Sequence, residues 1–177
     1  APSWISIATG VNPGRHGCFD FNKAEGALSG IRPLQSWDIR AKTFYEILEE
    51  NDRPFVLINL PGTYPPLTKG ITLTSLLTRG DNAVFPEELR EESEEMKNYR
   101  IFPDSGLLRK GKLSEYLNDI HDVESRRFDA LKQLWEKEWE VLFAVFSGGD
   151  WVSHELFGEL LDGKAPAEAE KVFRLMD

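Results

Sequence analysis

Asp150 and His154 are four residues apart in the segment FSGGDWVSH, Phe146 to His154, which follows an apolar run and contains a Gly-Gly pair. This order predicts a strand, then a tight turn, then polar side chains. Open α/β sheets have their functional sites at strand ends of this kind. If Trp151 begins a helical turn, the spacing brings the carboxylate and the imidazole to one side of the helix, where they could share a metal ion. The alternative is that Asp150 caps this helix and His154 is a solvated or packed histidine.

Two apolar segments have the character of the strands that would position such residues. The run Phe55 to Leu60 is rich in branched side chains and ends at Pro61-Gly62, and Thr43 to Glu50 before it has the spacing of a short amphipathic helix. The side chains of that helix predicted to face inward are Phe44, Ile47 and Leu48. Val141 to Phe146 is a continuous apolar run, as expected for a parallel strand covered on both faces. The pattern predicts an α/β fold with a mostly parallel sheet flanked by helices.

The segment between these strands is predicted to be mainly helical. Residues 67–85 are mixed and loop-like, whereas Pro86 to Lys97 carries six glutamates, which is typical of a solvated helix face. Further along, apolar residues recur at spacings of three and four, which predicts one long amphipathic helix, or two with a break near His121 to Ser125. These residues are Leu113, Tyr116, Leu117, Ile120, Phe128, Leu131, Leu134, Trp135 and Trp139. We expect a single partial α/β catalytic domain over residues 1–177 with a largely helical insertion at about residues 86–139.

The composition limits the possible partners. The chain carries a net charge of −9, which argues against general nucleic-acid binding because that needs a cationic surface. A small phosphate ester is still possible, since bound divalent cations would supply a local positive field. No apolar stretch of about 18 residues occurs, so no membrane segment is expected. The single cysteine, Cys18, excludes an internal disulfide, is predicted to be a small buried apolar residue, and is compatible with a cytoplasmic location.

The N-terminal segment combines a helix with a turn-rich loop. Pro2 to Thr9 has helix-compatible spacing, with Pro2 suited to the first turn and Gly10 to the end, and the loop VNPGRHG follows. The free N–H groups and the positive dipole end at the start of such a helix would point towards a phosphate group bound there.

Three motifs together carry a resemblance to a known family. They are PSW-x-S-x-ATG-x-NPG-x-HG from Pro2 to Gly17, LPGTYPP from Leu60 to Pro66, and GGDWVSH. In this order they resemble the type I phosphodiesterase/nucleotide pyrophosphatase family of the alkaline phosphatase superfamily. The resemblance implies an alkaline-phosphatase-like core, incomplete in this sequence, and a metal-dependent phosphoric ester hydrolase. It also implies two divalent metal ions, zinc in the usual case with manganese or magnesium as alternatives, and a small phosphate-ester or nucleotide substrate.

The same resemblance assigns roles to individual residues. Asp150 and His154 would hold one ion together with a third ligand from beyond Asp177. The family's threonine or serine nucleophile would fall immediately before Ala1, so we expect this sequence alone to be inactive. The family's phosphate-binding asparagine corresponds to Phe21, which makes the adjacent Asn22 the candidate, with Asp20 or a backbone amide as alternatives. Tyr64 would wall the substrate pocket, or else LPGTYPP is only a rigid loop.

Other functions remain open on the residues alone. The start x-Pro-Ser-Trp is similar to the C-x-P-S-R signature of sulfatases, although Trp4 replaces the arginine. Sulfatase or phosphomutase chemistry on the same fold is therefore one alternative, and a non-catalytic scaffold or interaction fragment is another. The residue before Ala1 would distinguish them: threonine or serine favours phosphoryl transfer, cysteine favours a sulfatase, and an inert residue favours a scaffold.

Overall fold

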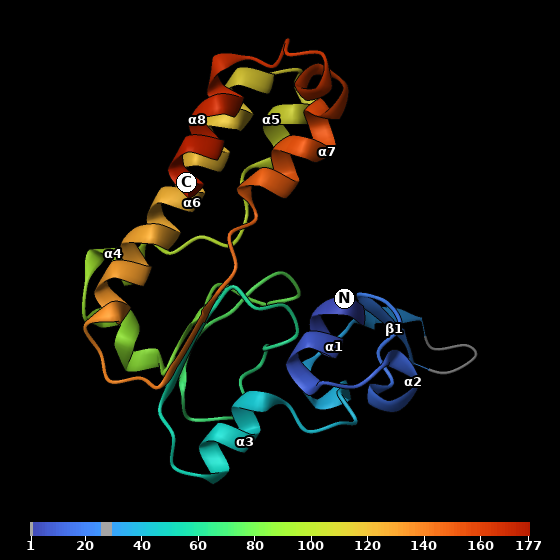
Figure 1. Cartoon of the computed structure of the whole chain (residues 1–177), viewed down its shortest axis with the longest axis vertical. Helices are drawn as coiled ribbons and strands as arrows, with labels where there is room; N and C mark the ends of the chain where they lie inside the picture. Colours follow the sequence, from blue (N-terminus) through green and yellow to red (C-terminus); the bar gives the residue numbers. More distant parts are fainter. Residues whose placement is uncertain (1, 26–29) are drawn as a thin grey trace.

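Four short strands form a mixed, mostly parallel sheet in the order β5-β4-β3-β6 in the computed structural model, which describes residues 2–25 and 30–177 (Figure 1). The strands are β3 (Phe55–Ile58), β4 (Ile71–Leu73), β5 (Val84–Phe85) and β6 (Val141–Ala144). Strand β3 pairs in parallel with both β4 and β6, and β5 runs antiparallel to β4. The prediction of an α/β fold with a mostly parallel sheet is confirmed.

Eight α-helices accompany the sheet in the described residues. They are α1 (Pro2–Thr9), α2 (Pro13–His16), α3 (Phe44–Glu50), α4 (Glu94–Lys97), α5 (Ser105–Arg109), α6 (Leu113–Trp135), α7 (Gly148–Leu161) and α8 (Ala167–Met176). Two 3₁₀ turns, η1 (Ser36–Asp38) and η2 (Glu87–Glu91), and an antiparallel hairpin of β1 (Asn22–Ala24) and β2 (Ile31–Pro33) complete the fold. In the part of the chain that the structure describes, no helix is both long enough and apolar enough to cross a membrane.

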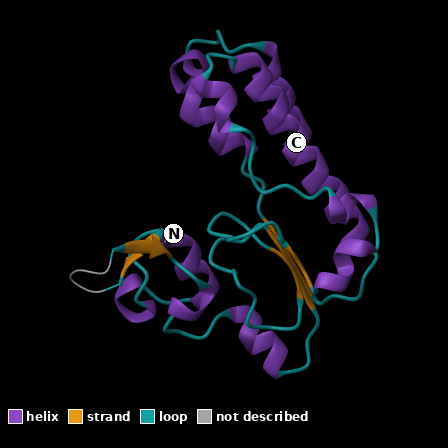
Figure 2. Cartoon of the chain, turned by 180° about the vertical axis from the view of Figure 1, so that it is seen from behind, coloured by secondary structure: helices purple, strands orange, loops and turns teal. Residues whose placement is uncertain are grey.

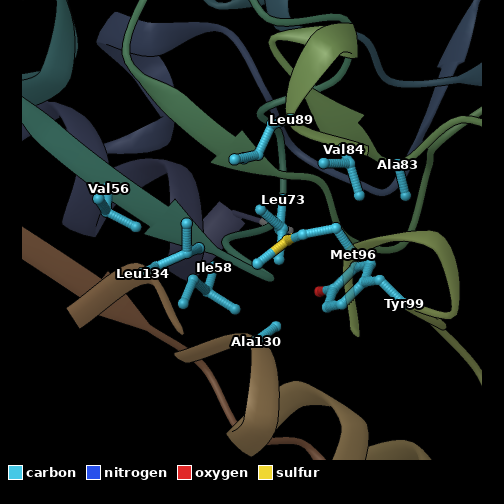
Figure 3. Close-up of a cluster of buried hydrophobic side chains, with 10 residues drawn as sticks. All are labelled: Val56, Ile58, Leu73, Ala83, Val84, Leu89, Met96, Tyr99, Ala130 and Leu134. Carbon is cyan, nitrogen blue, oxygen red and sulfur yellow. The ribbon is translucent and has the colours of Figure 1, made fainter. Parts of the chain in front are cut away.

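Successive side chains of β3 point to opposite faces of the sheet, and this divides the core into two layers. Val56 and Ile58 face α4 and the C-terminal part of α6, where they pack with Leu134 and their neighbours (Figure 3). Phe55 and Leu57 face the opposite way and pack with residues of α1 and α3. Because all four residues are buried, β3 is the central strand on which both layers depend.

Helix α6 connects this sheet to a separate helical cluster. Near its C-terminal end Leu134 belongs to the sheet core, whereas Leu117 near its start packs against α7 and α8. Figures 1 and 2 show α5, α7 and α8 gathered around the end of α6 that lies away from the sheet. The helix is continuous over 23 residues, so the one-helix alternative is correct. Two members of the predicted apolar stripe, Phe128 and Trp135, are nevertheless exposed.

Predictions for the short elements were partly wrong. Residues 67–85 contain β4 and β5, because strands this short have too few residues for a recognisable alternation and form through pairing with β3. In α3, Tyr45 takes the buried position and Ile47 is 49% exposed. Strand β6 ends at Ala144 and is only half-buried along its length, since it is an edge strand of the sheet and not one covered on both faces.

Candidate functional site

Asp150 and His154 lie on one side of α7, one turn apart. The Oδ1 atom of Asp150 is 3.6 Å from Nε2 of His154, and the two side chains are 73% and 74% exposed. Helix α7 begins at Gly148, three residues before the predicted start at Trp151, and its N-cap is Ser147. Asp150 is therefore not the cap, although its negative charge in the first turn favours the helix dipole. His154 is solvent-exposed, so both side chains are accessible to a ligand.

The pair has the donor chemistry of a partial zinc site. An oxygen and a nitrogen that both bind one tetrahedral zinc ion at about 2.1 Å are separated by about 3.4 Å, close to the separation observed here. Among the residues that the structure describes, no cluster contains three or more histidine, cysteine, aspartate or glutamate side chains suited to a metal. Asp150 and His154 thus fit two positions of one ion's coordination shell.

A cleft of about 260 Å³ lies at the carboxyl ends of β3 and β6, where Asp150 lines it but His154 does not. Asn59 and Val145, the residues that directly follow these two strands, both line it. Trp4 of α1 lines the same cleft as Asp150, so two of the motif-bearing segments converge on it from opposite ends of the sequence. The prediction that Asp150 lies at the carboxyl edge of the sheet is confirmed.

Asn59 joins the two strand ends and was not recognised from the sequence. It is 3% exposed and has a positive φ of 59°, a left-handed conformation that asparagine tolerates better than most residues. Its Nδ2 atom donates hydrogen bonds to the carbonyl of Val145 at 2.8 Å and to Oγ of Ser147 at 3.1 Å. An asparagine directly after a buried strand was the available signal.

Neither proposed substrate-binding residue lines this cleft. Asn22 is exposed in β1, where its backbone N–H donates to Oδ1 of Asp20 at 3.3 Å. Phe21, the position matched to the family's asparagine, lines the cleft in its place. The Tyr64 hydroxyl donates to the carbonyl of Arg79 at 2.6 Å, so it links two loops of the fold.

The histidine of the NPGRHG segment has a structural role. His16 is completely buried, and its Nδ1 accepts a hydrogen bond from the backbone N–H of Cys18 at 3.1 Å. Its Nε2 lies 3.0 Å from Oγ of Ser6, so the neutral tautomer with a proton on Nε2 satisfies both contacts. His16 thereby ties α1 to the loop after α2. Cys18 is buried as predicted, and burial raises the pKa of its thiol.

The burial of His16 predicts a pH-dependent stability. Burial lowers its pKa below the usual 6.5, so between 6.5 and the folded-state pKa the unfolded chain binds more protons. The free energy of unfolding should therefore fall as the pH is lowered through this range. Urea unfolding of the wild type and of His16→Gln between pH 7.5 and 5 measures the effect, which should be smaller in the variant. The exposed His154→Gln is the control, and an equal slope for His16→Gln and the wild type would refute the assignment.

Comparison with known proteins adds no assignment to these observations. No family model matches the chain, and no curated protein or solved structure matches it either. Function is therefore inferred from the residues of the cleft and their chemistry.

Proposed function

We propose that this protein is a metal-dependent phosphoric ester hydrolase of the phosphodiesterase/nucleotide pyrophosphatase type, with an alkaline-phosphatase-like core. The observation that carries the proposal is the shared cleft of Trp4 and Asp150, which joins the PSW helix to the GGDWVSH turn. In the resembled family these two segments supply the nucleophile and metal ligands of one site. The proposal includes a nucleophile immediately before Ala1, at the start of α1.

Asp150 and His154 are the proposed ligands of one divalent ion, zinc or alternatively manganese or magnesium. Asp150 contributes negative charge and His154 a neutral nitrogen, a combination that suits zinc. A bound cation would stabilise the negative charge that develops on the reacting phosphate. It would also offset the repulsion between a phosphate ester and a chain whose net charge is −9.

The lining of the cleft supports a nucleotide as the substrate. Five aromatic side chains contribute to it, from Trp4, Phe21, Phe102, Phe146 and Trp151. Aromatic rings bury the flat face of a base favourably by offset stacking, and they also exclude water from the reacting phosphate. A small nucleotide ester is therefore the proposed substrate class, and we propose the cytoplasm as its location.

Removal of metal is expected to abolish the activity. The protein as it occurs naturally should hydrolyse the p-nitrophenyl ester of thymidine 5′-monophosphate, lose this activity in EDTA and recover it with Zn²⁺, because the cation stabilises the transition state. Release of p-nitrophenol measures the rate. Turnover that is unchanged by EDTA would contradict the metal-dependent reaction. Preferential hydrolysis of p-nitrophenyl sulfate would instead identify a sulfatase, and no turnover of either ester would favour the scaffold.

A further inference from the structure

A buried ion pair lies directly beneath the turn that carries Asp150. Glu124 and Arg127 are one helical turn apart in α6, neither side chain is exposed, and Oε1 of Glu124 is 2.6 Å from Nη1 of Arg127. The same Oε1 atom accepts a hydrogen bond from the backbone N–H of Ser147 at 2.9 Å. The guanidinium carbon of Arg127 is 5.7 Å from the ring centroid of Trp151. The pair therefore contacts the chain on both sides of Asp150.

The turn is packed closely against this pair. A Cβ atom added to Gly148 would lie 2.9 Å from Cγ of Glu124 and 2.9 Å from Cγ1 of Val172. Real Cβ atoms do not approach other atoms this closely, so only glycine lets the backbone lie on Glu124 in this way. Gly148 of the motif thus has a packing reason, and the Gly-Gly pair lies in the first turn of α7 and not in the predicted tight turn.

The energetics of the pair do not explain its presence. Burying two charges carries a large desolvation cost, and an apolar pair of similar volume is often as stable. Within the described residues, Oε2 of Glu124 and Nε of Arg127 have no hydrogen-bond partner, so the pair does not recover all of that cost. An apolar pair could not provide the directional contacts that Glu124 makes with Ser147 and Arg127 makes with Trp151.

We propose that Glu124 and Arg127 are positioning residues for the metal-binding turn. Glu124 holds the backbone at Ser147 and Arg127 holds the ring of Trp151, so the first turn of α7 is oriented with Asp150 at the cleft. The inference rests on the proposed function in one respect, namely that Asp150 and His154 bind a metal. Its structural part, the anchoring of the turn, can be measured without metal.

The test replaces both residues with apolar ones. The double variant Glu124→Leu/Arg127→Met removes the two contacts, together with the hydrogen bond from Nη2 of Arg127 to the carbonyl of Ile101 at 3.2 Å. It leaves no unpaired buried charge, so it should fold. Hydrogen exchange of the Ser147 amide, measured by NMR, should become about tenfold faster or more, because a hydrogen bond to a charged group is lost. Zn²⁺ titration followed at the His154 imidazole should give an affinity about 10- to 100-fold lower, the usual effect of losing an outer-shell partner.

Two further variants separate positioning from a general structural effect. Glu124→Gln/Arg127→Met keeps an acceptor for the Ser147 N–H and should restore slow exchange at that amide. Asp122→Asn/Arg126→Gln removes the partly exposed ion pairs that Asp122 of the same helix forms with Arg126 and Arg100, and it should change neither measurement. Equal acceleration of exchange in the apolar and the Gln-containing variants would overturn the role of the hydrogen bond that Glu124 accepts from the Ser147 N–H.

The outcomes distinguish this inference from the proposed function. If the wild type binds Zn²⁺ at His154 and the apolar variant binds it equally well, the positioning role is overturned and the proposed function stands. If the naturally occurring protein shows no Zn²⁺ binding at His154, the proposed metal site is wrong, and the exchange rate at Ser147 decides the anchoring alone. An unchanged rate in the apolar variant would then overturn the anchoring as well.

Discussion

Arg127→Ala is expected to lower the free energy of unfolding by about 3–5 kcal/mol, because it leaves the Glu124 carboxylate buried without a countercharge. Neither side chain of the pair is exposed to solvent, so water does not replace the lost partner without reorganisation of the core. Urea unfolding followed by circular dichroism measures the change. This is a large fraction of the 5–15 kcal/mol by which typical domains are stable.

Arg126→Ala is the matched control for this measurement. Arg126 precedes Arg127 in α6 and forms an ion pair with Asp122 at 2.8 Å, but both side chains are partly exposed. Its loss should cost only about 0.3–0.5 kcal/mol, the usual value of a surface helix pair. In contrast, Glu124→Leu/Arg127→Met should recover most of the stability lost in Arg127→Ala. If Arg127→Ala lowered the free energy of unfolding no more than Arg126→Ala does, the Glu124 carboxylate would not be left as an uncompensated buried charge.

Asp150→Ala and His154→Ala should each reduce metal-dependent phosphodiesterase activity of the naturally occurring protein by more than about 100-fold. The loss of an outer-shell partner alone costs about 10- to 100-fold, and these residues are proposed as direct ligands. Because both side chains are about three-quarters exposed, the free energy of unfolding should remain within about 0.5 kcal/mol of the wild type. Bound zinc per folded molecule and the rate of p-nitrophenol release are the two measurements.

Glu159→Gln provides the control on the same helix. Glu159 is an exposed carboxylate of α7 and is not one of the two proposed metal ligands, so its neutralisation should leave metal content and activity unchanged. If Asp150→Ala or His154→Ala instead unfolds the protein while zinc per folded molecule is kept, the pair is structural. The functional assignment would then depend on the PSW helix alone.

Features that depend on neighbouring residues could be predicted from the sequence. Pro2 and Gly10 bound α1 as expected, and α3 begins after Thr43, whose side chain forms a capping box with Glu46. The proximity of Asp150 and His154 also follows from local geometry, because any helix places residues four apart on one side. In each case the interactions lie within about one turn of chain, so their pattern is present in a short window of residues.

Features that depend on distant residues needed the folded chain. Strand β4 is a strand because its three residues pair with β3, and nothing in so short a run indicates this. Asn22 and Tyr64 were predicted to bind substrate from their positions in the motifs. The cleft is instead lined by Phe21 and Asn59, because that depends on how separate loops meet at the strand ends. Likewise, Glu124 in α6 looks like an ordinary helix-surface residue until the Ser147 turn covers it. Such contacts form only when long-range packing brings the segments together, because their energies depend on burial and on partners that no local pattern specifies.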